Sequence, residues 1–179
     1  MAVIFSLIGY AGWEIVKKIG VLSDTHLVSL ADATDLATSL LQGPFADVDA
    51  ILHAGDMVHP QLTDCFDPVP CYAVRGNMDE PSAGTPYKRV VGFDGLRIGL
   101  IHGWGARTGL ERRVVDEFTG KRIDCLVYGH SHYPVCSQQS DLLIFNPGSP
   151  TDRRSAPTHT VGILTIENGA ITGEIISLG

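Results

Sequence analysis

The stretch LVYGHSHYP, residues 126–134, begins like a buried β-strand and ends in two histidines separated by one residue. Its apolar start is typical of the interior of a sheet, and Gly129 interrupts the run. A polar turn would explain His130 and His132 without any function, whereas half of a metal site would explain them by chemistry. The ends of the other predicted strands decide between these two interpretations.

The first half of the chain alternates short apolar runs with amphipathic segments. The apolar runs predict strands that end in polar residues, and the segments between them predict helical structure. This alternation is typical of βαβ units with parallel strand pairing. The predicted strands cover 17–24, 48–56 and 70–79, and the predicted helical segments cover 29–43 and 59–66.

The second half changes character, because three predicted hairpins replace the alternation. A predicted helix at 109–118 and a buried strand at 123–130 lie between the first two hairpins. The two halves together predict a single α/β domain, residues 17–179, with a mixed pair of β-sheets flanked by helices. The hairpins are predicted at 87–105, 133–149 and 159–178, with turns at 93–95, 140–141 and 168–169.

The composition is that of an ordinary globular protein. Its 179 residues are 44% hydrophobic and 18% charged, and the net charge is −7. An acidic chain without a basic stripe argues against a general nucleic-acid binder, so we expect no long nucleic acid as partner. The four cysteines form no CxxC pair and predict reduced thiols in the cytoplasm. Cys125 and Cys136 lie in apolar stretches and are interpreted as small core residues.

Residues 1–16 form an apolar extension whose only charged residue is Glu14. The extension is too short for a transmembrane helix, which needs about 20 residues, and it lacks the basic start of a secretory signal. We therefore expect no membrane partner. Its spacing fits a packed amphipathic segment, while a non-essential leader and self-association into a homo-oligomer are alternatives.

Polar residues that can bind metals follow five predicted strands. In open α/β sheets such residues meet beyond the carboxyl ends of the strands. Taken singly, each is more typical of a turn, a helix cap or a satisfied histidine. Turns need no particular order of Asp, Asn and His, so the ordered set favours one shared site. The set is Asp24 and His26 in SDTH, Asp56 in AGDMV, Asn77 in RGNMD, His102 in LIHGWG, and His130 and His132 in GHSH.

The chemistry of this set indicates two metal ions. Carboxylate, imidazole and amide oxygen together suit borderline divalent ions, and the lack of a thiolate argues against a structural zinc site. Seven groups are too many for one ion and suit two ions that share a carboxylate. Two ions about 3.5–4 Å apart can hold a phosphoryl group and lower the pKa of a bridging water. The set predicts hydrolysis at a phosphate, with manganese as the expected metal and iron, nickel, cobalt or zinc as alternatives.

The ordered set D-x-H, G-D, G-N, H-G and G-H-x-H resembles the signature of the calcineurin-like metallophosphoesterase family. The chain is most similar to its small single-domain phosphodiesterase branch, from about Lys17 to the C-terminus. The resemblance implies a four-layer α/β/β/α sandwich, with helices outside two stacked mixed sheets. It also implies hydrolysis of a small phosphodiester by a hydroxide bridging two metals.

The resemblance assigns the ligands to two sites. Asp56 would bridge the two ions, and Asp56, Asn77 and His102 are the expected catalytic residues. The two histidines of GHSH would then serve different ions. The first ion would take Asp24, His26 and His132, and the second would take Asn77, His102 and His130.

One position departs from many larger relatives, which have a histidine after the Gly-Asn pair that assists the leaving group. Here the position is Met78, and a thioether cannot donate a proton. The small branch is similar in lacking this histidine, so the chemistry is retained. The departure predicts a preference for phosphodiesters with leaving groups of low pKa over phosphomonoesters with poor ones.

Three further polar residues lie next to the predicted ligands in the sequence. His53 either supports Asp56 or is a buried structural histidine. Arg75 either contacts the substrate or pairs with a carboxylate. Asp79 either orients a ligand or caps a helix.

The segment FNPGSP, residues 145–150, predicts a tight loop near GHSH. Its Pro-Gly pair is a turn signal, and similar loops flank the site in relatives. Arg153 and Arg154 follow this loop and are expected to be solvated.

The sequence is also compatible with three other functions. A retromer subunit resembles this fold and serves as a non-enzymatic protein-interaction scaffold, but its metal pocket is degraded, whereas the seven positions here are intact. A nuclease or nucleotide phosphoesterase acting on short or cyclic substrates is the second alternative. A monoesterase is the third, and Met78 argues against it.

Overall fold

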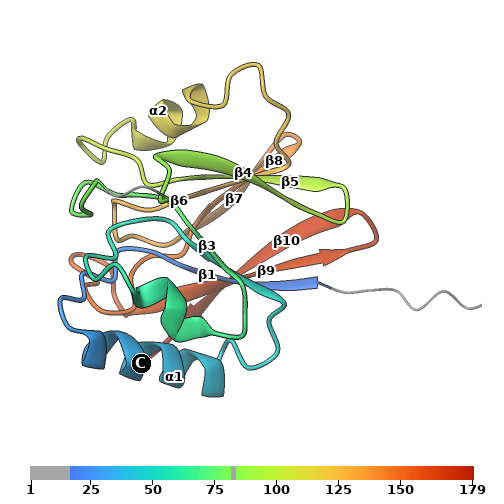
Figure 1. Ribbon diagram of the computed structural model, residues 1–179. Helices are drawn as coiled ribbons and strands as arrows, with labels where there is room; N and C mark the ends of the chain where they lie inside the picture. The colour runs from blue at the N-terminus through green and yellow to red at the C-terminus, as the bar shows by residue number, and fades with distance from the viewer. Residues whose placement is uncertain (1–16, 82–83) are drawn as a thin grey trace, which may run out of the picture.

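Two five-stranded β-sheets stack face to face in the computed structural model, which describes residues 17–81 and 84–179 (Figure 1). The predicted role of the apolar extension, residues 1–16, lies outside the described residues. One helix covers the outer face of each sheet, with α1 below and α2 above in the view of Figure 1. The four-layer α/β/β/α arrangement is therefore confirmed.

The first sheet has the order β10-β9-β1-β2-β3. Strands β1 to β3 are parallel, because the helices α1 (Leu30–Gln42) and η1 (Leu62–Phe66) carry the chain back between them. The C-terminal hairpin adds β9 and β10 in antiparallel pairing. The strands are β1 (Lys17–Leu22), β2 (Ala50–His53), β3 (Cys71–Ala73), β9 (Thr160–Glu167) and β10 (Ala170–Ser177).

The second sheet has the order β4-β5-β6-β8-β7. Its central strands β5, β6 and β8 are parallel, and the edge strands β4 and β7 are antiparallel to their neighbours. The helix α2 (Leu110–Asp116) connects β5 to β6. The strands are β4 (Lys88–Phe93), β5 (Leu96–Ile101), β6 (Cys125–Tyr128), β7 (Val135–Gln139) and β8 (Leu142–Asn146). The three hairpins predicted from the sequence are all present.

Three apolar layers hold the sandwich together. The central layer lies between the sheets, and the other two lie under α1 with η1 and under α2. Burial of such side chains contributes about 1.5–3 kcal/mol each relative to exposure. Helix α1 begins at Ser29, whose Oγ accepts the backbone N–H of Asp32 at 3.1 Å, so the helix that covers the first sheet has a fixed start.

The cysteine predictions are partly right. All four cysteines lie in the described part and are free thiols, and Cys125 is buried between the sheets. The prediction that Cys136 is a core residue is wrong, because Cys136 is exposed on β7. Strand β7 is the edge strand of its sheet, so its side chains alternate between partly covered and exposed positions. The Cys136 thiol donates to the Gly173 carbonyl at 3.3 Å.

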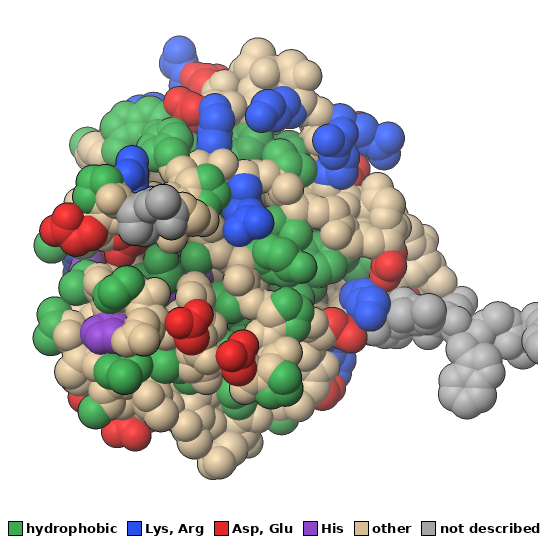
Figure 2. All heavy atoms as spheres, viewed as in Figure 1, with side chains coloured by type: hydrophobic (Ala, Val, Ile, Leu, Met, Phe, Trp, Pro, Cys, Tyr) green, Lys and Arg blue, Asp and Glu red, His purple; other side chains and the backbone are tan. Residues whose placement is uncertain are grey.

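Across 17–81 and 84–179, no helix combines the length and the apolar character needed to cross a membrane. On the face shown in Figure 2, Lys and Arg side chains gather around α2, and Asp and Glu side chains are spread over the lower half. The basic residues on this face form no continuous stripe.

Candidate metal centre

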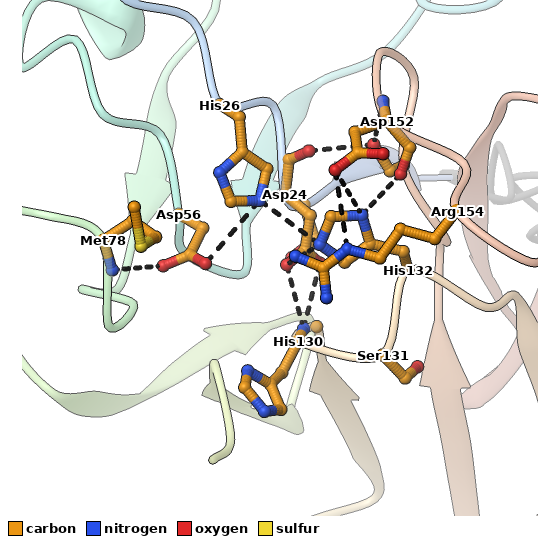
Figure 3. Close-up of polar contacts among 12 residues, drawn as sticks. Asp24, His26, Asp56, Met78, His130, Ser131, His132, Asp152 and Arg154 are labelled. Carbon is orange, nitrogen blue, oxygen red and sulfur yellow. Dashed lines mark hydrogen bonds and ion pairs between the residues drawn. The ribbon is translucent and has the colours of Figure 1, made fainter. Parts of the chain in front are cut away.

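All seven predicted ligands collect at one edge of the sandwich. Each follows the carboxyl end of a parallel strand, so side chains from both sheets meet there. Figure 3 labels five of the seven: the side chains of Asp24, His26, Asp56 and His132 point toward one another, and His130 lies beside them with its backbone N–H on the Asp24 carboxylate. They are Asp24 and His26 after β1, Asp56 after β2, Asn77 after β3, His102 after β5, and His130 and His132 after β6.

Asp24, His26 and His132 form the first cluster. The Nε2 atoms of the two histidines are 3.2 Å apart, and their rings stack with centroids 5.0 Å apart. The Nε2 atom of His132 lies 3.2 Å from Asp24 Oδ1. One cation could contact all three groups.

Asn77, His102 and His130 form the second cluster. The Asn77 Oδ1 atom lies 3.0 Å from His130 Nδ1, and the rings of His102 and His130 meet edge to face at 5.3 Å. The two histidines of GHSH therefore lie in different clusters, and the pair spans the centre.

Asp56 lies between the two clusters. Its Oδ2 atom is 3.3 Å from Nε2 of His102 and 3.7 Å from Nε2 of His26. Its Oδ1 atom accepts the backbone N–H of Met78 at 2.7 Å, which fixes the direction of the carboxylate. Asp24 also reaches toward the second cluster, with Oδ1 3.9 Å from His102 Nε2. The geometry fits a carboxylate shared between two ions, and it adds Asp24 as a neighbour of both clusters.

The histidine hydrogen bonds fix which nitrogen faces the centre. His102 donates from Nδ1 to the Ala54 carbonyl at 2.7 Å, and His130 donates from Nε2 to the Gly105 carbonyl at 2.8 Å. His132 donates from Nδ1 to the Asp152 carbonyl. A neutral imidazole has one donor and one acceptor nitrogen, so in the neutral form of each of the three rings the inward nitrogen carries a lone pair. Metal-bound histidines are held in this way.

One of these nitrogens makes no hydrogen bond within 17–81 and 84–179, although the Asp56 carboxylate lies 3.3 Å from it. The Nε2 atom of His102 is buried and has no hydrogen-bond partner among the described residues. In the second cluster, the His130 lone pair faces the Asn77 side-chain oxygen, which is also an acceptor. Facing acceptors repel one another unless a cation lies between them. The residues present therefore fit divalent metal ions.

The charges in the centre are mutually dependent. Burial would raise the pKa of Asp24, but the contacts with His132 and His102 outweigh burial and lower it. Burial also opposes ionisation of Asp56, yet the contact with His102 brings its pKa to about 2. Burial would lower the pKa values of His102 and His132. The Asp56 and Asp24 carboxylates raise the pKa of His102 instead, and Asp24 with the Asp152 carbonyl raises that of His132. The centre therefore holds two negatively charged carboxylates. Protons on His102 and His132, or bound metal ions, can balance this charge.

Five of the seven ligand residues have left-handed backbone conformations. Such values are uncommon outside glycine and cost about 1–3 kcal/mol each. In an extended strand, the side chains of His130 and His132 would lie on the same face and point in the same direction. The left-handed backbone at both residues lets the two rings point in different directions. The φ angles are 55° at Asp24, 48° at His26, 55° at Asp56, 67° at His130 and 55° at His132.

Two glycines are required by close approach. A Cβ atom on Gly76 would lie 2.1 Å from Asp56 Oδ1, and one on Gly129 would lie 1.9 Å from Ser23 Oγ. The Gly-Asn and Gly-His pairs of the sequence therefore let neighbouring loops pack against the ligands.

Asp79 and His53 support the ligands, and neither contacts the centre directly. The Asp79 carboxylate accepts the backbone N–H groups of Asp56 at 2.9 Å, Val58 at 2.7 Å and Gly76 at 2.8 Å. His53 is buried, accepts the Gly55 N–H through Nδ1 at 3.1 Å and places Nε2 3.2 Å from the Thr25 hydroxyl. Both residues hold the loops that carry Asp24 and Asp56.

Arg75 is half-buried, and its backbone N–H donates to the Pro86 carbonyl at 2.9 Å. Its side chain makes no ion pair within 17–81 and 84–179. The pairing of Arg75 with a carboxylate that the sequence suggested is therefore not seen.

The loop after β8 contributes contacts that the sequence only partly indicated. As expected, this loop lies beside GHSH: Asn146 donates to the Gly129 carbonyl at 2.9 Å, and Ser149 donates to the Asp24 carbonyl at 2.8 Å. The sequence did not indicate Asp152, although its backbone carbonyl accepts the Nδ1–H of His132 and so fixes the tautomer of that ring. Only its place three residues after Ser149 in this loop could have pointed to it.

Comparisons with known proteins agree with this geometry. The sequence profile of the calcineurin-like phosphoesterase superfamily domain matches residues 18–169. A protein of Methanothermobacter thermautotrophicus named as a probable metallophosphoesterase is 35% identical over 165 residues, which cover 90% of this chain and 92% of that protein.

Solved structures share the fold. A predicted phosphoesterase from Streptococcus pneumoniae superposes with a TM-score of 0.72 at 22% identity, over 91% of this chain and 90% of the other. Vps29 from Entamoeba histolytica, solved with zinc, superposes with a TM-score of 0.59 at 20% identity, over 90% and 99% of the two chains. At these identities the likeness concerns the fold alone. The profile match and the sequence identity show that the chain belongs to the calcineurin-like phosphoesterase superfamily.

Proposed function

We propose that the protein is a phosphodiesterase that works with two divalent metal ions at this centre. The observation that carries the proposal is the set of three histidine nitrogens whose lone pairs face two carboxylates and an amide oxygen. Asp24, His26 and His132 would hold one ion, Asn77, His102 and His130 the other, and Asp56 would contact both. Bound there, the ions would neutralise phosphoryl charge and lower the pKa of a water molecule.

The residues of the chain supply binding and orientation. Asp56 is fixed by its bonds with Met78 and Asp79, so its free oxygen stays between the clusters. The backbone carbonyls of Ala54, Gly105 and Asp152 keep three imidazoles in the ligating tautomer. Asp56, Asn77 and His102 are the residues that we expect to lie nearest the reacting phosphorus.

Met78 supports a preference for diesters. Its backbone N–H donates to Asp56, and the residue is 57% exposed beside the centre. A thioether cannot donate a proton to a departing alkoxide. Substrates with leaving groups of low pKa need no such donor, so activated phosphodiesters should be hydrolysed faster than alkyl monoesters.

Manganese is the metal that we propose, because oxygen and imidazole ligands without thiolate suit it. Iron, nickel, cobalt and zinc are the alternatives. The four free cysteines fit a reducing compartment such as the cytoplasm.

The test is a matrix of metals and substrates on purified protein. The protein is stripped with a chelator, reloaded with each metal, and assayed on an activated diester, an alkyl monoester and a cyclic nucleotide, with bound metal measured in parallel. Two equivalents of metal and fastest turnover of the activated diester would support the proposal. Bound metal without hydrolysis of any ester would contradict it and would favour a non-enzymatic scaffold.

A further inference from the structure

Arg154 lies beside the metal centre and shares a carboxylate oxygen with one of its proposed ligands. The Oδ2 atom of Asp152 is 3.5 Å from Arg154 Nε and 3.5 Å from His132 Nδ1. Figure 3 shows the Arg154 side chain extended next to the His132 ring, with Asp152 above both in this view. The sequence predicted that both arginines after the Pro-Gly loop are solvated. In the structure, Arg154 also contacts a carboxylate that lies against His132.

The neighbouring arginine is held differently. The Nη1 atom of Arg153 donates to the Ala156 carbonyl at 2.8 Å, which keeps that guanidinium within its own loop. The backbone of Arg154 has a φ of 45°, a left-handed value that Arg153 does not share. Two adjacent residues of the same type therefore have different surroundings.

Arg154 differs from the other basic residues in the ion pair that it forms. Six ion pairs join Lys or Arg to a carboxylate in the described residues. Only the Arg154–Asp152 pair includes a carboxylate that also lies against a proposed metal ligand.

The guanidinium keeps donors available. Arginine has five N–H donors in a fixed fork, and Asp152 lies against Nε, which leaves the terminal nitrogens. The side chain of Arg154 is 53% exposed, so these nitrogens are open to a ligand. Arginine is the preferred side chain for phosphoryl oxygens, because its fork matches two of them at once.

We propose that Arg154 binds a non-bridging phosphoryl oxygen of the substrate through its terminal nitrogens, while Asp152 positions it against His132. This inference rests on the proposed function, because it takes the substrate to be a phosphate ester at the centre. A phosphodiester carries one negative charge on its non-bridging oxygens, and Arg154 would add a protein cation beside the two proposed metal ions.

The experiment compares wild type with R154A, R154K and R153A, each loaded with manganese. Bound metal is measured first, then the dissociation constant for inorganic phosphate by calorimetry, then kcat and KM on bis(p-nitrophenyl) phosphate. R153A is the matched control, because it removes the same charge from the adjacent residue.

We expect R154A to keep its metal and to bind phosphate about 10- to 100-fold more weakly, the range for a lost charge-assisted hydrogen bond. The value of kcat/KM for the diester should fall by a similar factor. R154K keeps the charge without the fork and should lie between wild type and R154A. R153A should stay within about twofold of wild type for phosphate and diester, because surface charges away from a site have small effects.

The outcomes separate this inference from the proposed function. If R154A and R153A bind phosphate equally well, or if R154A loses its metal, Arg154 is only structural and the inference is wrong. If wild type hydrolyses no ester but its phosphate binding still depends on Arg154, the anion contact stands and the proposed function fails.

Discussion

The carboxylate of Asp79 accepts the backbone N–H of Asp56 at 2.9 Å, although 23 residues separate the two along the chain. The same carboxylate accepts the N–H groups of Val58 and Gly76. One side chain thus joins the loop after β2 to the loop after β3, and each loop carries a proposed metal ligand.

Replacing Asp79 by alanine should therefore leave three backbone donors without their acceptor. We expect D79A to lower the free energy of unfolding by about 2 kcal/mol or more, measured by urea denaturation of the metal-free protein. D79N keeps one side-chain oxygen and should lose less. The exposed Glu167 supplies the control, since E167A should change stability by less than about 0.5 kcal/mol. Equal effects of D79A and E167A would contradict the role assigned to Asp79.

Asp56→Asn should remove the charge shared by the two proposed ions. We expect bound metal to fall and turnover of an activated diester to drop at least about 100-fold, because the carboxylate that faces both His26 and His102 becomes neutral. Metal analysis and the diester assay check this, with the exposed Asp141→Asn in the β7–β8 turn as control. Normal metal content together with normal activity would rule out the bridging role.

Gly76→Ala should disturb the centre without changing any ligand. The added Cβ would lie 2.1 Å from Asp56 Oδ1, so the carboxylate or the loop must move. We expect weaker metal binding, measured by titration with a metal indicator, and a lower melting temperature. Gly92→Ala is the matched control, because a Cβ there has no neighbour closer than 3.9 Å and the backbone is not left-handed. Indistinguishable metal affinities for the two variants would show that Gly76 is not needed.

Metal should stabilise the protein more as the pH rises from 6.5 to 8.5. The pKa values of His102 and His132 are raised in the folded metal-free protein. Their contribution to stability is therefore complete below the ordinary value of 6.5 and is lost as the pH rises through the folded values. Metal binding has the opposite dependence, since it requires neutral imidazoles.

Melting curves with a chelator and with manganese, recorded across this range, measure both trends. His53, whose pKa is lowered to about 4 in the folded protein, affects the metal-free and the metal-loaded curves alike, so it cancels from their difference. A constant difference between metal-free and metal-loaded melting temperatures would contradict the coupling.

Met78→His should extend the substrate range. An imidazole at this position could donate a proton to a poor leaving group, so we expect the rate on an alkyl monoester to rise about tenfold relative to the activated diester. Met78→Gln, which has no comparable acid, is the control. A fall in both rates without a change in their ratio would show that Met78 does not set the preference.

Local patterns were sufficient to predict the strands, the three hairpins and the strand ends at which the seven proposed ligands lie. Apolar periodicity and Asp-Gly or Asn-Gly turns act over a few residues, and parallel strands necessarily end at one edge. The family signature added the layering of the two sheets. These features depend on residues that are close in the sequence or fixed in order.

The contacts that support the ligands could not be predicted in the same way. The bonds of Asp79, the carbonyl of Asp152 and the ion pair of Arg154 join loops that are far apart in the chain, and no local pattern distinguishes them from ordinary turn residues. The prediction that Cys136 is buried was wrong for a related reason. Its apolar neighbours indicate a strand, but they do not show whether that strand lies at the edge of a sheet.

The metal centre draws its side chains from both sheets, with Asp24, His26, Asp56 and Asn77 on one and His102, His130 and His132 on the other. With metal bound, the centre would cross-link the two sheets of the sandwich. Separating the layers would then require breaking coordination bonds as well as exposing the apolar interior. Metal should therefore slow unfolding of the whole domain, and protease resistance would report the loading state of the centre even in a variant that has lost all catalysis.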